Sequence, residues 1–165
     1  MINNELYLLA EQTVSNLKKY GLLIATAESC TGGLLSGYIT SISGASEIFE
    51  MGIASYSNRI KHEKLGVPQE ILDKYGAVSE QTAELMAEGI RLSASADIGI
   101  SVTGVAGPDS SEGHPPGYVF ISLSTKETSK TLLLNIKPLS RDYVRLEAIR
   151  EIFNLINNYI EEAEK

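Results

Sequence analysis

Cysteine and histidine are scarce in this chain of 165 residues, which contains one cysteine and two histidines. A single cysteine excludes an internal disulfide and is typical of a protein from a reducing cytosol. No spacing of histidine, cysteine and acidic residues resembles a metal site, so we expect no metal. No apolar run approaches the roughly 20 residues that span a bilayer, and the N-terminus is polar and acidic. We therefore expect a cytoplasmic protein without a signal peptide or membrane segment.

Basic residues are also outnumbered, because 14 lysines and arginines stand against 21 acidic residues and give a net charge of −7. A nucleic-acid partner would need a basic surface, so this balance argues against one. It leaves room for a small anionic ligand bound by a local turn or by a few arginines. The length and the hydrophobic content of 43% fit a single globular domain, 1–165, and we find no internal repeat or interdomain linker.

Hydrophobic periodicity predicts helices interleaved with about five strands. The predicted helices cover 4–19, 34–42, 58–65, 68–74, 79–93 and 140–160, and the predicted strands cover 22–25, 49–57, 96–102, 119–124 and 130–136. We expect Asn58, Ser79 and Ser140 to cap the helices that begin beside them, and the last two strands to form an antiparallel hairpin. This order predicts an α/β fold, a three-layer α/β/α sandwich around a mixed sheet of about five strands.

The segment Thr26–Gly33 places Ser29 between a predicted strand and a predicted helix. Such a turn can present a nucleophile and bind an anion through free backbone N–H groups. The alternative is a helix-capping serine without a chemical role. A nucleophilic serine needs a base, and we expect His62 on a helix surface and His114 in a loop, so both are poor candidates. Cys30 is either a reactive thiol or, in the interpretation that we favour, a small buried residue.

Lys61 is the residue that we choose as the base for Ser29. In a partly desolvated pocket its pKa would fall, and the neutral amine would take the serine proton. The alternative is an ordinary solvated lysine on a helix. Tyr56, nearby in the sequence, would hydrogen-bond the lysine or the substrate, or else fill the core.

Two further groups of residues are candidates for ligand binding. Thr103, Gly104 and Gly107 lie at the end of the most apolar strand, where open α/β sheets bind ligands. They form either a backbone cradle for a phosphate or oxyanion, with the threonine hydroxyl as a further donor, or a tight structural loop. Arg141 and Arg145 are four residues apart on one helix face, and they bind a ligand phosphate or face solvent.

A set of sequence blocks resembles the CinA C-terminal domain family, the nicotinamide-nucleotide amidohydrolases. The blocks are Ala27-Glu28-Ser29-Cys30-Thr31-Gly32-Gly33, Ala54-Ser55-Tyr56-Ser57-Asn58 with Lys61, Leu65-Gly66-Val67, Gly76-Ala77-Val78-Ser79-Glu80, Met86-Ala87-Glu88-Gly89 and Val102-Thr103-Gly104-Val105-Ala106-Gly107-Pro108. The resemblance covers nearly the whole chain, and the blocks are specific together rather than singly. Larger family members carry an additional N-terminal domain that resembles molybdopterin-binding proteins, so we expect the stand-alone form here.

The resemblance implies hydrolysis of the carboxamide of nicotinamide mononucleotide to nicotinate mononucleotide and ammonia, in pyridine nucleotide recycling. Ser29 would form an acyl-enzyme, Lys61 would be the general base and then the proton donor to ammonia, and Tyr56 would orient the lysine or assist proton transfer. No metal or organic cofactor is implied. Backbone N–H groups of residues 30–33 would stabilise the oxyanion. The residues expected around the substrate are Glu28, Cys30, Thr31, Gly32, Gly33, Asn58, Thr103, Gly104, Gly107, Arg141 and Arg145.

The loop after Gly107-Pro108 departs from the family pattern. Family members commonly have a glycine-rich run followed by Lys-Pro-Val-Gly-Thr-Val, whereas His114 stands here where lysine is usual and Tyr118 replaces a small residue. Glu112 would be unfavourable beside a phosphate. Two alternatives therefore stay open: a nucleotide-binding or regulatory module without turnover, and a Ser–Lys amidase or esterase for another small substrate. We also expect a homodimer formed through the apolar terminal helix.

Overall fold

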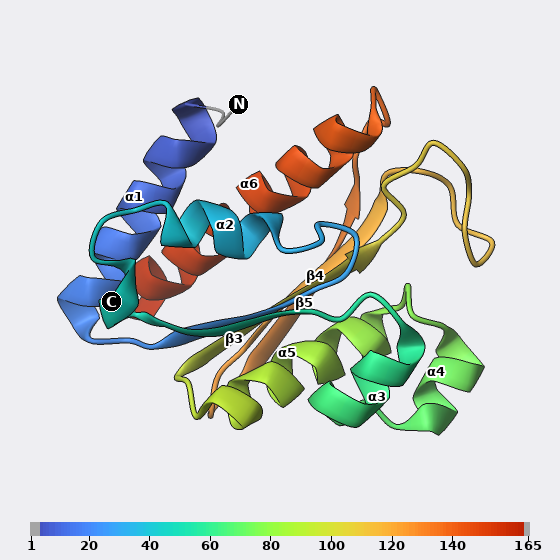
Figure 1. Cartoon of the computed structure of the whole chain (residues 1–165), viewed down its shortest axis with the longest axis horizontal. Helices are drawn as coiled ribbons and strands as arrows, with labels where there is room; N and C mark the ends of the chain where they lie inside the picture. The colour runs from blue at the N-terminus through green and yellow to red at the C-terminus, as the bar shows by residue number, and fades with distance from the viewer. Residues whose placement is uncertain (1–3, 164–165) are drawn as a thin grey trace.

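A five-stranded mixed sheet forms the centre of the computed structural model, which describes residues 4–163 (Figure 1). β1 pairs in parallel with β2 and β3, whereas the β3–β4 and β4–β5 pairs are antiparallel. The mixed sheet and the hairpin are therefore confirmed. The strands, in spatial order, are β2 (Phe49–Ala54), β1 (Ile24–Glu28), β3 (Ile98–Gly104), β4 (Tyr118–Ser124) and β5 (Ser129–Asn135). Residues 1–3, in the polar N-terminus that argued against a signal peptide, and residues 164–165, at the end of the expected domain, lie outside the described part.

Helices cover both faces of the sheet and complete the predicted three layers (Figure 1). One core cluster joins α1, α2 and α6 to the sheet, and a smaller one joins α3, α4 and α5 to its other face. The three-layer sandwich is therefore confirmed. The helices are α1 (Asn4–Tyr20), α2 (Leu34–Thr40), α3 (Asn58–Leu65), α4 (Gln69–Tyr75), α5 (Glu80–Ala94) and α6 (Arg141–Ala163), and a 3-10 helix, η1 (Ala45–Glu47), precedes β2.

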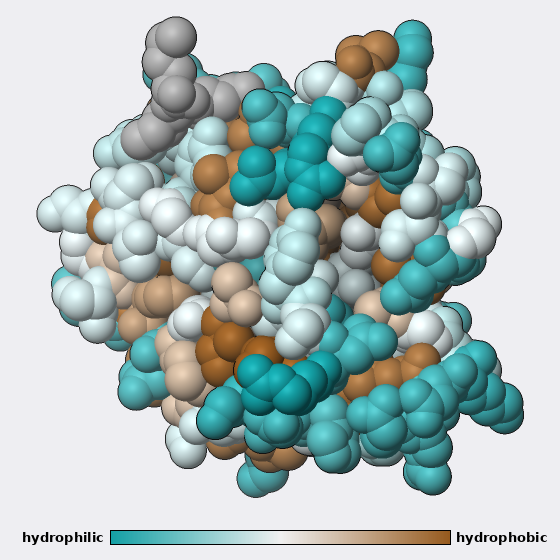
Figure 2. Space-filling view, turned by 45° about the vertical axis from the view of Figure 1, so that its right-hand side comes forward, coloured by the Kyte–Doolittle hydropathy of each residue, from teal (hydrophilic) through white to brown (hydrophobic). Residues whose placement is uncertain are grey.

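The apolar residues of α6 are buried inside the chain. Val144, Ile152, Phe153 and Ile156 are inaccessible to solvent and belong to the core cluster shared with α1 and the sheet. On the face shown in Figure 2, apolar side chains are scattered among hydrophilic ones. The reason for expecting a dimer through the terminal helix is therefore wrong, and the homodimer itself stays a prediction.

Two strands extend further along the chain than the apolar runs indicated. β1 continues through Glu28, and β3 includes Thr103 and Gly104, which pair with β4 instead of forming the predicted turn. The shift arises because both strands end in polar or small residues that are buried by the surrounding layers. Because β1 runs through Glu28, Ser29 is the first residue after that strand. Conversely, β2 ends at Ala54, earlier than predicted.

Helix α3, which carries Lys61, begins where the sequence predicted it, but its cap is different. The hydroxyl of Ser57 accepts a backbone N–H of the first turn at 3.3 Å, so Asn58 is the first helical residue rather than the cap. The predicted caps Ser79 and Ser140 are confirmed, because their hydroxyls accept backbone N–H groups at 3.2 and 3.0 Å.

Close packing of α3 on α5 fixes the position of the lysine. Gly89 of α5 lies directly against the carbonyl of Leu65, the last residue of α3, and a Cβ at position 89 would collide with that oxygen. Only glycine allows the two helices to approach this closely. The contact therefore holds α3, and Lys61 with it, at a set distance from the sheet.

Candidate active site

Ser29 lies at the carboxyl end of the parallel strands, in a turn with a fixed backbone. Its N–H donates to the carbonyl of Val102 at 2.9 Å, and its carbonyl accepts the N–H of Gly32 at 3.0 Å. The serine lines the pocket described below. It therefore occupies the strand-to-helix turn that the sequence predicted.

Glu28 is fully buried and organises this turn. Three of the donors to its carboxylate are backbone N–H groups at the start of α2, which have no partner within the helix itself. Glu28 does not line the pocket, so its predicted role in substrate binding is corrected to one of positioning. The carboxylate accepts five hydrogen bonds: from the hydroxyls of Thr31 (2.7 Å) and Ser36 (2.6 Å), and from the N–H groups of Gly33 (3.1 Å), Leu35 (3.0 Å) and Ser36 (2.9 Å).

The later residues of the turn face away from the pocket. Thr31 is fully buried, and Gly32 and Gly33 have positive φ values of 61° and 97° that favour glycine. Arg145 supports the turn from α6, with Nη2 donating to the carbonyl of Thr31 at 2.9 Å and Nη1 to Asp142 at 3.2 Å. None of these residues lines the pocket. Their predicted contacts with substrate are therefore corrected to structural roles.

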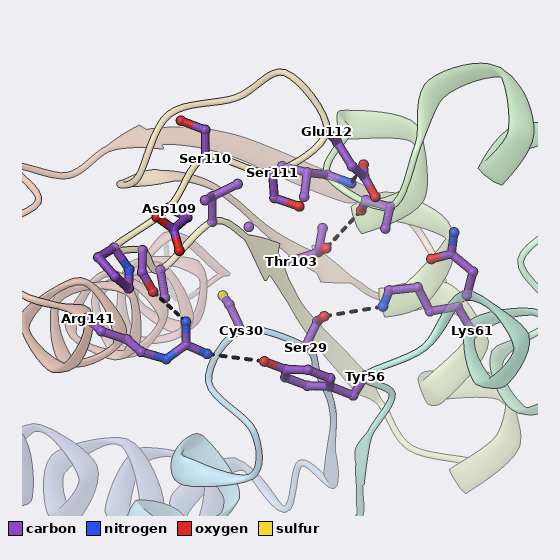
Figure 3. A pocket seen from close by; sticks show the side chains of 18 residues that line it. Ser29, Cys30, Tyr56, Lys61, Thr103, Asp109, Ser110, Ser111, Glu112 and Arg141 are labelled. Carbon is purple, nitrogen blue, oxygen red and sulfur yellow. Dashed lines mark hydrogen bonds between the residues drawn. The ribbon is translucent and has the colours of Figure 1, made fainter.

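Lys61 reaches Ser29 from helix α3 and is almost completely buried, with 1% of its surface exposed. Its Nζ donates to Ser29 Oγ at 3.2 Å (Figure 3) and to the carbonyl of Ser55 at 2.7 Å. Burial lowers the pKa of Lys61 from its ordinary value of 10.5, and the carboxylate of Glu112 opposes part of this shift. Burial therefore shifts the amine toward the neutral form, which can accept a proton from the serine.

Ser55 is a partner of the lysine that sequence reasoning missed. Its N–H donates to the carbonyl of Glu28 at 2.7 Å, and its hydroxyl donates to the same oxygen at 3.3 Å. These bonds tie the end of β2 to β1 and place the Ser55 carbonyl against the Lys61 amine. No sequence signal marks this role, because every residue type supplies a backbone carbonyl.

A pocket of about 430 Å³ opens above Ser29 (Figure 3), a volume within the range of small-molecule sites. Many of the predicted site residues line it, namely Ser29, Cys30, Tyr56, Asn58, Lys61, Thr103, Gly104, Gly107 and Arg141. The remaining wall residues are Ala77, Val78, Val105, Ala106, Pro108, Asp109, Ser110, Ser111 and Glu112. The pocket therefore unites residues from the turn after β1, from β3, α3 and α6, from the turn before α5 and from the long loop before β4.

Arg141 brings a positive charge to one side of the pocket. Its Nη1 donates to the carbonyl of Gly107 at 2.6 Å and its Nη2 to the hydroxyl of Tyr56 at 3.1 Å. Within residues 4–163, no carboxylate forms an ion pair with this guanidinium. Tyr56 is 63% exposed, so it neither fills the core nor takes the lysine-orienting place that we expected. It holds Arg141 instead.

Thr103 and Gly104 shape the pocket through their backbone. The hydroxyl of Thr103 donates to the carbonyl of Ala77 at 2.8 Å (Figure 3), so its predicted role as a donor to the ligand is corrected. A Cβ at Gly104 would lie 2.7 Å from the Cα of Val119, so packing of β3 on β4 accounts for this glycine.

The loop between β3 and β4 forms the rim of the pocket. The Glu112 carboxylate accepts the N–H of Val78 at 3.0 Å. His114 stacks on Tyr118 with ring centroids 4.2 Å apart, so the two residues that depart from the family pattern contact each other. The sequence analysis singled out this loop for its departure from the family pattern, but it did not count the rim residues among the expected site residues. These residues are Asp109, Ser110, Ser111 and Glu112.

Backbone N–H groups of the turn differ in their availability to a ligand. Those of Gly32 and Gly33 donate within the turn and cannot stabilise an oxyanion, which corrects part of the prediction. Within the described residues, the N–H groups of Cys30 and Thr31 have no oxygen acceptor. Cys30 lines the pocket, and burial raises the pKa of its thiol to about 12, so the thiol stays protonated at neutral pH. Its N–H is therefore the candidate oxyanion donor.

Together these groups can activate a serine toward a carbonyl carbon and bind an anion beside it. In the described part of the chain, no group of three or more histidine, cysteine or acidic side chains is arranged to hold a metal ion. Nor is any helix between residues 4 and 163 long and apolar enough to cross a bilayer. Fold and site define an α/β protein with a serine–lysine pair at the carboxyl end of its parallel strands.

The chain belongs to the CinA C-terminal domain family, whose sequence profile matches residues 7–160. It is 41% identical over 152 residues, 92% of its length, to a competence-damage inducible protein of Caldanaerobacter subterraneus subsp. tengcongensis. It is 46% identical over 148 residues, 90% of its length, to one of Streptococcus pneumoniae. The chain spans only 37% and 35% of the length of these two relatives.

Solved structures share the fold. The competence/damage inducible protein CihA from Agrobacterium tumefaciens aligns with a TM-score of 0.92 and 32% identity over 96% of this chain and 97% of that one. A CinA superfamily protein from Klebsiella pneumoniae aligns with a TM-score of 0.92 and 28% identity over 95% and 98%. The predicted family and fold class are therefore confirmed.

Proposed function

We propose that this protein hydrolyses the carboxamide of nicotinamide mononucleotide to nicotinate mononucleotide and ammonia, as a step of pyridine nucleotide recycling. The observation that carries the proposal is the contact of buried Lys61 with Ser29, at 3.2 Å, in a pocket that also holds Arg141, which forms no ion pair within residues 4–163. A serine with a neutral amine beside it suits attack on an amide, and a guanidinium suits a phosphate. Membership of the CinA family supports an amidohydrolase.

In the first half of the reaction, Ser29 is the nucleophile and Lys61 moves the proton. The neutral amine takes the hydroxyl proton while Oγ bonds to the amide carbon, and the carbonyl oxygen becomes negative. The N–H of Cys30 donates to this oxygen. When the C–N bond breaks, the lysine gives its proton to the departing nitrogen, so ammonia leaves and an acyl ester remains on the serine.

In the second half, water repeats the attack. Lys61, neutral again, takes a proton from water as the water oxygen bonds to the ester carbon. The ester C–O bond then breaks, and the proton returns to the oxygen of Ser29. Nicotinate mononucleotide leaves, and both residues regain their starting states. The carbonyl of Ser55 accepts a hydrogen bond from the lysine throughout and keeps Nζ directed at the serine.

The proposed orientation of the substrate follows from the charges. The phosphate binds Arg141, which is held by Tyr56 and by the carbonyl of Gly107. The carboxamide then lies over Ser29, and Asn58 borders the pocket near Lys61. Tyr56 is therefore a residue that positions the arginine.

Ammonia release from nicotinamide mononucleotide and from nicotinamide riboside, which lacks the phosphate, tests this proposal. We expect kcat/KM to be about a hundredfold lower for the riboside, as loss of a charged contact predicts. Arg141→Met lowers kcat/KM for the mononucleotide far more than for the riboside. Arg59→Met, on the exposed surface of α3, is the matched control.

Two outcomes would contradict the proposal. The first is an equal kcat/KM for the two compounds, which would mean that the protein does not recognise the phosphate. The second is thermal stabilisation of the protein by the mononucleotide without ammonia release, which would favour a binding module without turnover.

A further inference from the structure

Charged groups stand on both sides of the pocket, with Asp109 on the same side as Arg141. Arg141 lies on one side and Glu112 on the other, with Ser29 between them (Figure 3). The carboxylate of Glu112 also favours the charged form of Lys61, which agrees with its place on the lysine's side of the pocket. When the lysine is neutral, Glu112 provides the charge on its side of the pocket.

The carboxylate of Glu112 is held in place but is not neutralised. Its Oε2 accepts the N–H of Val78 at 3.0 Å. Within residues 4–163, Glu112 forms no ion pair, and its Oε1 accepts no hydrogen bond. This oxygen is therefore available to attract a cation or an N–H donor and to repel an anion, with part of the charge screened because Glu112 is exposed.

Backbone geometry restricts where this carboxylate can lie. The backbone of Glu112 has a φ of 52°, in the left-handed region that residues other than glycine seldom adopt. Its Oε2 packs against Gly76, where a Cβ would collide with it. The rim loop and the turn before α5 therefore fit together around one side chain.

We infer that Glu112 is a specificity-determining residue that distinguishes the carboxamide substrate from its carboxylate product. The inference rests on the proposed function, which places the phosphate on Arg141 and the reacting group over Ser29, next along the pocket toward Glu112. The carboxamide is neutral, its nitrogen donates hydrogen bonds, and the pyridinium ring is cationic, so all three properties suit a nearby carboxylate. Hydrolysis replaces the amide by an anion, which Glu112 repels. Glu112 therefore favours retention of the substrate and release of the product.

Calorimetric titration of a Ser29→Ala background tests the inference without turnover. Nicotinamide mononucleotide and nicotinate mononucleotide are the two probes, and their Kd values are compared in the background and after Glu112→Gln. Glutamine keeps an acceptor for the N–H of Val78 and removes the charge. Glu112→Asp, which keeps the charge, is a second variant. Asp109→Asn, a pocket carboxylate on the side of Arg141 (Figure 3), is the matched control.

We expect Glu112→Gln to tighten binding of the carboxylate about fivefold, the size of one partly screened charge contact, without tightening binding of the carboxamide. Glu112→Asp keeps the ratio of the two Kd values near that of the background, and Asp109→Asn shifts both Kd values by the same factor. An unchanged ratio in Glu112→Gln overturns the inference and leaves the proposed function standing. If neither compound binds the background protein, the proposed function fails and the inference fails with it.

Discussion

Lys61 Nζ lies 3.2 Å from Ser29 Oγ, although the two residues are 32 positions apart and belong to different layers of the fold. Two features bring them together: the turn that Glu28 organises after β1, and the packing of α3 on α5 at Gly89. The same packing buries the lysine, and burial lowers its pKa. Helix packing therefore influences both the position of Lys61 and the direction of its pKa shift.

The buried lysine makes stability depend on pH. Its pKa is lowered in the folded state, so between that lowered value and about 10.4, where lysine titrates in an unfolded chain, the unfolded state binds more protons. Stability therefore rises with pH across this window, and the penalty is largest below the folded pKa. We expect the melting temperature of Lys61→Met minus that of the wild type to be larger at pH 6 than at pH 10. A difference that does not vary with pH, or varies as in the exposed Lys64→Met, would contradict this expectation.

Glu28 is expected to stabilise the fold by organising the turn after β1. Glu28→Gln replaces one acceptor oxygen by an NH₂ group that faces hydrogen-bond donors, and it removes the charge that those donors stabilise. We expect a loss of about 3 kcal/mol in the free energy of unfolding, from urea titration. Glu50→Gln, on the exposed side of β2, is the control and is expected to change stability by less than about 0.5 kcal/mol. Equal losses in the two variants would contradict the assigned role.

Gly89→Ala is expected to displace α3. The new methyl group collides with the carbonyl of Leu65, so the helix that carries the lysine must move away from α5. We expect a loss of about 2 kcal/mol or more in stability, together with reduced activity. Gly37→Ala, in the middle of α2 with open space around it, is the matched control and is expected to stabilise the protein by about 0.5–1 kcal/mol. Wild-type stability and activity in Gly89→Ala would contradict the role of this contact.

Tyr56→Phe separates the two roles considered for the tyrosine. Because the hydroxyl contacts Arg141 rather than Lys61, we expect KM for nicotinamide mononucleotide to rise a few-fold, by about the value of one hydrogen bond, with kcat little changed. Tyr75→Phe, outside the pocket, is the control. A fall in kcat at unchanged KM would contradict this expectation and would indicate that Tyr56 assists proton transfer.

Sequence periodicity was sufficient for the sandwich and for α3, because these depend on local patterns. It misplaced the ends of β1 and β3, since Glu28 and Thr103 are polar residues that the tertiary structure buries within strands. The same limit applies to the site. The sequence motifs singled out Ser29 and Lys61, but their contact in space depends on the turn after β1 and on the packing of α3.

Other features of the site depend on contacts that residue type does not encode. The carbonyl of Ser55 positions the lysine through its backbone, which no pattern reveals. Glu28 belongs to the strongest motif, yet the donors that surround it, and not its identity, decide that it organises the turn instead of binding substrate. Glu112 lies in the rim loop, and only the folded structure shows that its carboxylate lies across the pocket from Arg141.

Ammonia release from nicotinamide mononucleotide by the wild type, Ser29→Ala and Lys61→Met tests the serine–lysine account most directly, with Lys64→Met as the control on the same helix. The account predicts release by the wild type and the control, and rates at least about a thousandfold lower in the other two variants, as for removal of a nucleophile or its base. Release at the wild-type rate by a folded Ser29→Ala or Lys61→Met protein would contradict it.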